Sequence, residues 1–317
     1  MVSAAQQAHS RVHTHAQRHT TPVIGAQSSK GGVGKTSASA NVAAAAASGG
    51  ARVLLIDVDQ QISATSVMLT RHHTGATVLD SINNPTDTPQ HVIPSDWSHL
   101  PEIRNSGGTL DIIPGHEHLT DTQLQPTPEN PRRLFALREC VAAVSDNYDL
   151  VVFDCPPSKG SIVQSVLLAS SVIIAVTTPE YLDIRGLAET LRFVDAFHRE
   201  AQAIGEPSAQ VGYVIVNKLD IQQRDHRDGL AEISSQVVNI PWRQTPRRAV
   251  VPRVTAQGLP LIGAGDRAAA PVAEAVRELT ADILQVCDSP VLAEVGERLR
   301  QAGTGRKHTS LRRQETA

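Results

Sequence analysis

The sequence predicts an α/β fold, a doubly wound and mostly parallel sheet with helices on both faces. Segments that are apolar throughout alternate with helical segments, which is the pattern of parallel strands buried on both sides. A glycine-rich loop at 29–36 joins the first of these strands to the first helix. Two later strands end in aspartates, and the carboxyl ends of parallel strands meet at one edge of a sheet.

Each element is predicted from its own pattern. Apolar runs between turn residues predict buried strands at 22–29, 52–59, 110–115, 150–157, 171–179 and 211–220. An alanine-rich helix at 36–48 is stopped by Gly49 and Gly50. Further helices are expected at 132–149, 186–199, 272–287 and 290–301. Residues 83–109 are rich in Pro, Asn, Ser and Gly and are expected to form a long surface excursion.

Composition limits the class of protein. The 317 residues are 40% hydrophobic and 19% charged, ordinary values for a soluble domain, and only 3% are aromatic. The net charge of −3 means that any nucleic-acid binding must come from a local patch. The three cysteines are scattered, and no run approaches the roughly 18 apolar residues of a membrane span. We therefore expect a cytoplasmic protein with a disordered arm at 1–21, a core domain at 22–287 and a short helix with a basic disordered tail at 288–317.

The loop at 29–36, SKGGVGKT, nearly matches the phosphate-binding pattern G-x-x-x-x-G-K-[ST]. Ser29 replaces the first glycine, and Lys30 adds a second cation. Lys35 is expected at the β- and γ-phosphates, and the hydroxyl of Thr36 at Mg²⁺. The predicted nucleotide-binding residues of this segment are Lys30, Gly31, Gly32, Val33, Gly34, Lys35, Thr36 and Ser37.

This loop resembles the deviant Walker A loop of the ParA/MinD group of ATPases, and the resemblance covers about residues 22–287. It implies that Lys30 reaches the ATP of a second subunit, so that Lys30, Lys35 and Asp59 are the catalytic residues. By the same resemblance Asp59 positions the attacking water. Asp57 and Asp154 join Thr36 in the magnesium shell. Lys159 stands where most relatives have an apolar residue.

Asn217 opens the sequence Asn-Lys-x-Asp at a strand end, which is a guanine-reading signature of GTPases. In the ParA group the equivalent strand also ends in an asparagine, which contacts adenine. Asn217 is therefore expected to read the base in either case. The rest of the resemblance favours ATP, and GTP remains the alternative.

The resemblance is closest to the ParA type, which partitions plasmids or chromosomes. It implies an ATP-dependent homodimer on the nucleoid that binds DNA without sequence preference, and a ParB-like partner that stimulates slow hydrolysis. The alternatives are a MinD-like or other cargo-positioning ATPase, an iron–sulfur electron-transfer relative, and a member that keeps the fold without turnover. The C-terminal helix lacks the bulky apolar face of a membrane anchor, so no membrane partner is expected.

A local basic patch is the candidate DNA-binding surface. Residues 243–253 contain four arginines and no acidic residue, and three prolines near them predict a surface loop rather than a regular helix. Such a patch would bind phosphates without reading bases. The candidate DNA-binding residues are Arg243, Arg247, Arg248 and Arg253. A plain solvated loop and the basic tail at 304–317 are the competing interpretations.

Overall fold

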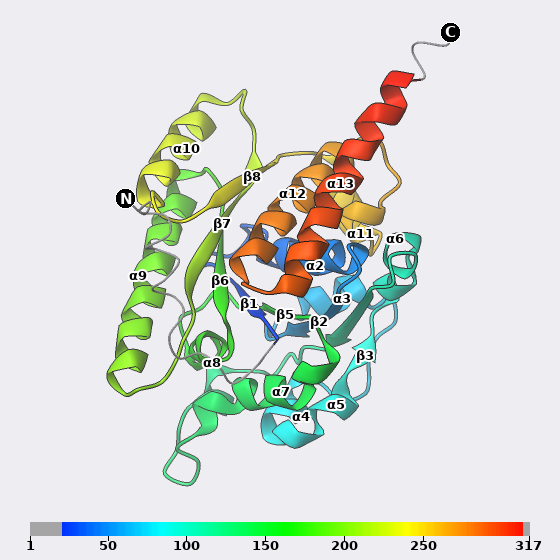
Figure 1. Ribbon diagram of the computed structural model, residues 1–317. Helices are drawn as coiled ribbons and strands as arrows, with labels where there is room; N and C mark the ends of the chain where they lie inside the picture. Colours follow the sequence, from blue (N-terminus) through cyan, green and yellow to red (C-terminus); the bar gives the residue numbers. More distant parts are fainter. Residues whose placement is uncertain (1–20, 313–317) are drawn as a thin grey trace.

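The computed structural model describes residues 21–312, with side chains described through Ala302. Residues 1–20 and 313–317, which include nearly all of the expected N-terminal arm, lie outside the described residues. The described chain builds one eight-stranded sheet in the order β3-β4-β2-β5-β1-β6-β7-β8 (Figure 1). The strands are β1 (Val23–Gln27), β2 (Arg52–Asp57), β3 (Ile93–Pro94), β4 (Thr109–Ile113), β5 (Leu150–Asp154), β6 (Val172–Thr177), β7 (Gln210–Leu219) and β8 (Trp242–Pro246).

The sheet is parallel except at one edge, where the two-residue strand β3 pairs antiparallel with β4. β1 lies at the centre, between β5 and β6, and β2 pairs with β5 on its other side. The residues of the four strands β1, β5, β2 and β6 are buried, apart from Arg52 at the start of β2. The predicted doubly wound fold is confirmed. Since β1, β2 and β5 are parallel neighbours, their carboxyl ends share one edge of the sheet.

Helices cover both faces of the sheet. In Figure 1, α2, α12 and α13 lie over one face, while α7 and α8 lie over the other. α9 and α10 pack on β6 and β7 on the same face as α8. The helices are α2 (Lys35–Ser48), α3 (Ser63–Met68), α4 (Val78–Asn83), α5 (Thr88–His91), α6 (Pro101–Arg104), α7 (Ala136–Val144), α8 (Ser161–Ala169), α9 (Tyr181–Ala203), α10 (Arg224–Gln236), α11 (Val250–Ala256), α12 (Ala270–Val286) and α13 (Pro290–Arg312).

The segment 83–109 is packed more tightly than the expected surface excursion. It supplies β3 and the short helices α5 and α6, and its side chains Trp97 and Ile103 are buried in the core beside α2. The indole N–H of Trp97 donates a hydrogen bond of 2.7 Å to the carbonyl of Gly258. The polar composition reflects frequent turns, while a few apolar side chains anchor the segment to the domain.

The C-terminal helix belongs to the core domain rather than to a separate tail. α13 runs to Arg312, past the expected end near residue 301, and lies beside α12 and over α2 (Figure 1). Leu292, Val295 and Leu299 are buried in this contact. A Cβ on Gly49 would lie 2.7 Å from Cγ1 of Val295, so this glycine allows the close approach. Between residues 21 and 312, no helix is both long and apolar enough to cross a bilayer.

The expectation of an arginine-bearing loop at 243–253 is wrong. The segment forms the edge strand β8 and the start of α11. Pro246 ends the edge strand, and Pro252 stands in the first turn of α11, where a missing N–H leaves no helical hydrogen bond unmade. The prolines therefore mark element ends and do not prevent regular structure.

Candidate functional site

The glycine-rich loop forms an open cradle between β1 and α2. Gly32 and Gly34 have positive φ angles of 81° and 93°, which favour glycine over any residue with a side chain. A Cβ on Gly34 would also lie 2.2 Å from the amide nitrogen of Asn217. No side chain caps the N-terminus of α2, so the first N–H groups of this helix face the cradle without a capping partner. Such a terminus attracts anions.

Lys35 begins α2 and is buried beneath the loop, and its ammonium group donates to the carbonyl of Lys30 at 3.3 Å. Burial lowers the pKa of Lys35, while the charges of Asp154 and Asp59 oppose that change. Lys35 is therefore the buried cation of the loop, and it lies close to both the phosphate cradle and the carboxylates of Asp154 and Asp59.

The two predicted metal-binding aspartates lie side by side. Asp57 of β2 and Asp154 of β5 are register partners at the ends of neighbouring parallel strands, and both are buried. Asp57 accepts hydrogen bonds from the backbone N–H and hydroxyl of Thr65 at 2.9 and 2.8 Å. Asp154 accepts one from the hydroxyl of Ser39 at 2.8 Å, and its Oδ2 has no hydrogen-bond partner.

This arrangement disfavours two negative charges without a cation. Burial raises the pKa of Asp57 to about 6, against hydrogen bonds from Thr65. Burial, and then the charge of Asp57, raise the pKa of Asp154 to about 7. A buried carboxylate oxygen without a partner beside a second carboxylate suits a hard divalent cation, which prefers oxygen ligands. The residues present therefore fit magnesium.

Asp59 follows β2 by two residues and is also buried. Its backbone N–H donates to Oδ1 of Asp57 at 3.2 Å, and its own Oδ1 accepts from the N–H of Gln61 at 2.9 Å. The turn at 59–62 therefore holds the Asp59 carboxylate at the edge of the sheet, where Asp57 and Asp154 also end.

Helix α9 contacts the start of the loop, a role that the sequence did not indicate. Thr190 Oγ1 lies 3.0 Å from the backbone nitrogen of Ser29 and 2.9 Å from its hydroxyl. Thr190 also donates to the carbonyl of Gly186, so both contacts with Ser29 must be donated by Ser29. A Cβ on Gly186 would lie 2.6 Å from Cγ of Lys30, so the stem of Lys30 lies against α9.

Lys159, which follows β5, forms an ion pair of 3.1 Å with Glu189 of helix α9. Both side chains are more than one-third exposed. The hydrogen bond from Lys159, with the charges of Lys159 and Lys30, holds the pKa of the Glu189 carboxyl below its ordinary value. Glu189 therefore links the segment after β5 electrostatically to the loop lysine.

A hollow of about 740 Å³ opens beside the loop, and Gly34, Asn217, Thr245, Pro246 and Arg247 are among its lining residues. Asn217 lies near the end of β7, and its side-chain amide donates a hydrogen bond of 3.0 Å to the carbonyl of Val33. Lys218 donates to the carbonyl of Gly32 at 2.6 Å. The predicted base-reading residue thus lines a largely apolar pocket next to the phosphate cradle.

Asp220, the last residue of Asn-Lys-x-Asp, is engaged by its own turn. Its Oδ1 accepts from the N–H of Gln222, and its Oδ2 accepts from the side chain of Gln223, both at 3.1 Å. These contacts place Asp220 in the turn that precedes α10.

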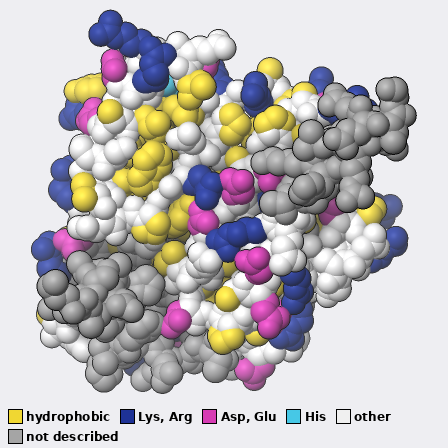
Figure 2. Space-filling model, turned by 45° about the horizontal axis from the view of Figure 1, so that its top comes forward, with side chains coloured by type: hydrophobic (Ala, Val, Ile, Leu, Met, Phe, Trp, Pro, Cys, Tyr) yellow, Lys and Arg dark blue, Asp and Glu magenta, His cyan; other side chains and the backbone are white. Residues whose placement is uncertain are grey.

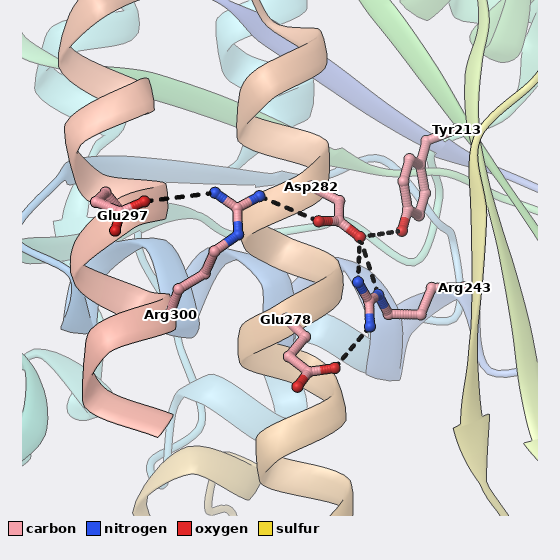
Figure 3. Close-up of polar contacts among 6 residues, drawn as sticks. All are labelled: Tyr213, Arg243, Glu278, Asp282, Glu297 and Arg300. Atoms are coloured by element: carbon pink, nitrogen blue, oxygen red, sulfur yellow. Dashed lines mark hydrogen bonds and ion pairs between the residues drawn. The ribbon is translucent and has the colours of Figure 1, made fainter. Parts of the chain in front are cut away.

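The four arginines do not form one free patch, contrary to expectation. Arg243 is held by Glu278 at 2.6 Å and by Asp282 at 2.8 Å, and Arg300 of α13 binds the same Asp282 at 3.1 Å (Figure 3). Arg253 pairs with Asp266. Arg247 and Arg248 are exposed. Figure 2 shows basic and acidic side chains mixed over the visible face rather than gathered by sign.

Comparisons with known proteins agree with this geometry. A family model described as an AAA domain matches residues 21–204, more than half of the chain. Sporulation initiation inhibitor protein Soj of Bacillus subtilis is 32% identical over 173 residues, covering 54% of this chain and 64% of Soj. Chromosome partitioning protein ParA of Myxococcus xanthus is 27% identical over 174 residues, covering 55% of this chain and 58% of that protein. The chain thus matches less than two thirds of the length of these relatives.

The fold has solved counterparts as well. The septum site-determining protein MinD of Pyrococcus horikoshii, complexed with Mg-ADP, has a TM-score of 0.60 at 18% identity, covering 83% of this chain and 96% of that one. An eight-stranded, mostly parallel sheet with a phosphate loop after its central strand is the fold of a P-loop nucleotide hydrolase. The chain belongs to the ParA/MinD family of P-loop ATPases and is close to its ParA-type members.

Proposed function

We propose that this chain is a ParA-type partition ATPase that hydrolyses ATP with magnesium, dimerises on ATP and binds DNA without sequence preference. The observation that carries this proposal is the pair of buried carboxylates Asp57 and Asp154 at the ends of neighbouring strands, together with the buried Lys35 of the phosphate loop, on which the charges of Asp154 and Asp59 act. The names of the Soj and ParA relatives support the partition role, and the Mg-ADP in the MinD structure supports the ligands.

Each side chain has a distinct task in this proposal. The N–H groups of the loop and of the start of α2 bind the phosphates, with Lys35 at the β- and γ-phosphates. Thr36, Asp154 and Asp57 would hold magnesium, which would neutralise charge on the phosphate oxygens. Asp59 orients the attacking water from its fixed turn. Lys30 adds positive charge to the phosphoryl group of the partner subunit, and a transferring phosphoryl group is stabilised by such charge.

The DNA and protein partners follow from family membership and from local charge. The exposed pair Arg247 and Arg248 is the strongest remaining candidate for phosphate contacts, since Arg243 and Arg253 are engaged by carboxylates. A ParB-like protein would stimulate hydrolysis, and the complex would lie on the nucleoid in the cytoplasm.

Three alanine variants separate binding, dimerisation and chemistry. Lys35→Ala should lose ATP binding because a buried cation at the phosphates disappears. Lys30→Ala should bind ATP but fail to dimerise, because its charge acts in the partner subunit. Asp59→Ala should bind ATP, dimerise and accumulate as a dimer, because only water activation is lost.

Size-exclusion chromatography with and without ATP, combined with phosphate release, measures all three properties. The proposal fails if wild-type protein stays monomeric with ATP and magnesium. It also fails in its assignment of roles if Lys30→Ala dimerises normally, or if Asp59→Ala hydrolyses ATP at the wild-type rate.

A further inference from the structure

The orientation of the Asn217 amide is fixed by two backbone groups of opposite character. The carbonyl of Val33 can only accept, so the atom 3.0 Å away must be Nδ2. The N–H of Lys218 can only donate, so the atom 2.9 Å away must be Oδ1. The two ends of the amide are therefore distinguishable from their surroundings alone.

A third contact comes from β8. The hydroxyl of Thr245, a buried side chain, lies 2.6 Å from Oδ1 of Asn217. Since Oδ1 is an acceptor, the Thr245 hydroxyl donates this hydrogen bond. Both lone pairs of Oδ1 are then used, one by Lys218 and one by Thr245. The second N–H of Nδ2 is the one hydrogen-bonding group that the amide still offers to a ligand.

We propose that Thr245 is a positioning residue that fixes Asn217 as a hydrogen-bond donor to ring atom N7 of a purine. This inference deepens the proposed function and rests on it. Asn217 and Thr245 both line the hollow beside the phosphate loop, where the base of a nucleotide would lie. N7 is an acceptor in adenine and in guanine, whereas the exocyclic amino group of adenine is a donor and needs an acceptor. The amide oxygen has no lone pair left for that amino group.

Two consequences follow for base selection. Asn217 recognises a purine but does not by itself distinguish adenine from guanine. Guanine presents further donors, and each oxygen of Asp220 already accepts one hydrogen bond, from Gln222 or from Gln223. A preference for ATP over GTP would therefore have to come from contacts other than the Asn217 amide.

The test changes one atom of the ligand, N7 of the purine, and one group of the protein, the hydroxyl of Thr245. In 7-deaza-ATP a C–H group replaces N7 without changing the shape of the base. Wild-type protein should bind ATP roughly tenfold more tightly than 7-deaza-ATP, the order expected for one lost hydrogen bond at a partly buried donor. Thr245→Val should weaken ATP binding severalfold and leave 7-deaza-ATP unchanged, and Thr245→Ser should behave like wild type.

Thr255→Val is the matched control. Thr255 lines the same hollow, but its hydroxyl donates to the carbonyl of Val251 in its own helix. This variant should keep the wild-type ratio of the two dissociation constants. Titrations by calorimetry supply the constants, and thermal melting shows that each variant is folded.

The outcomes separate this inference from the proposed function. If wild-type protein binds neither ATP nor GTP, the proposed function fails. If it binds ATP and 7-deaza-ATP equally, the contact with N7 is refuted, whatever the Thr245 variants do. If Thr245→Val weakens both ligands by the same factor, Thr245 only supports the fold. If Thr245→Val does not fold, Thr245→Ala takes its place, because it also removes the hydroxyl that donates to Asn217.

Discussion

Asp154 shows most directly how burial sets the chemistry of the site. The side chain is fully buried with one oxygen unpaired, and its register partner Asp57 brings a second carboxyl group alongside. The raised pKa values, about 6 for Asp57 and about 7 for Asp154, mean that ionising the pair costs folding free energy when no cation is present. Binding of magnesium would remove that cost.

This cost predicts a pH dependence with a definite sign. The pKa of Asp154 is higher in the folded than in the unfolded protein, so the folded protein holds more protons between about pH 4 and pH 7, and stability falls as the pH rises through that window. Asp154→Asn keeps the contact with Ser39 and cannot ionise. Without added magnesium it should melt several degrees above wild type near pH 8 and show a smaller gain near pH 5, since each pKa unit corresponds to about 1.4 kcal/mol.

Asp149→Asn provides a control of opposite sign. Partial burial raises the pKa of Asp149, but its hydrogen bonds with Arg52 and the charge of Arg52 lower it overall. Its contribution to stability is present above the unfolded pKa and is lost in acid, so Asp149→Asn should melt below wild type near neutral pH. Equal melting temperatures for Asp154→Asn and wild type across the pH range would contradict the buried-charge account.

At the scale of elements, α9 links the phosphate loop to the protein surface. Gly186, Glu189 and Thr190 lie on one stripe of this helix, at spacings of three and four residues. They contact the Lys30 stem, Lys159 and Ser29, respectively. The position of Lys30 therefore depends on the space that Gly186 leaves on this face of α9.

Gly186→Ala tests this dependence. Alanine is favoured over glycine within a helix by about 1 kcal/mol, so the variant should be at least as stable as wild type unless Lys30 resists displacement. Its new Cβ would meet Cγ of Lys30, and the lysine must move. We expect normal ATP binding with impaired ATP-dependent dimerisation, measured by size-exclusion chromatography.

A double variant sharpens the interpretation. If Gly186→Ala acts through Lys30, adding it to Lys30→Ala should cause no further loss of dimerisation, because coupled residues are not additive. A Gly186→Ala protein that dimerises like wild type would show that Lys30 reaches its partner from another position.

The elements that the sequence predicted well are those buried on both faces. β1, β2, β5 and β6 are short, continuous apolar runs between turn residues, which is the pattern of parallel strands buried on both faces. No apolar run predicts β8, because an edge strand that is half exposed and bounded by prolines lacks that signal. The roles of the loop and its aspartates were inferred from the family resemblance, and in the structure Asp57 and Asp154 end neighbouring parallel strands.

Other parts of the site could not be predicted, because their contacts join distant residues. Thr190 is hydrogen-bonded to Ser29, which is 161 residues away in the sequence, and Thr245 is hydrogen-bonded to Asn217, which is 28 residues away. Neither threonine lies in a motif. Ser39 was within reach of prediction, since it stands one helical turn after Lys35, facing the same edge.

On the scale of the whole molecule, internal ion pairs decide which arginines remain for a partner. Asp282 of α12 binds Arg243 of β8, Arg300 of α13 and the hydroxyl of Tyr213 (Figure 3). This network ties the edge strand to the two C-terminal helices. A DNA backbone would have to compete with two carboxylates for Arg243, so this arginine is better suited to stability than to phosphate binding.

The salt dependence of DNA binding measures how many arginines take part. Four free arginines per subunit would give about eight phosphate contacts per dimer and a slope of log K against log salt near −7, at about 0.9 per contact. Arg247 and Arg248 alone give about four contacts and a slope near −3.6. We therefore expect the shallower slope for the ATP-bound dimer, by fluorescence anisotropy between about 50 and 200 mM salt.

Variants then assign that slope to particular side chains. Removing Arg247 and Arg248 together should abolish most of the salt dependence. Because both arginines also line the hollow beside the phosphate loop, ATP binding of the double variant is measured without DNA, so that a loss of DNA contacts is distinguished from a loss of nucleotide. Arg243→Gln should lower the melting temperature, since β8 loses its ties to Glu278 and Asp282, and should leave the slope unchanged. Deletion of residues 304–317 should preserve most ATP-dependent binding. If that deletion abolishes binding and the Arg247/Arg248 double variant does not, the basic C-terminal segment is the DNA-binding element, and the partition ATPase would hold DNA through its end rather than through the turn after β8.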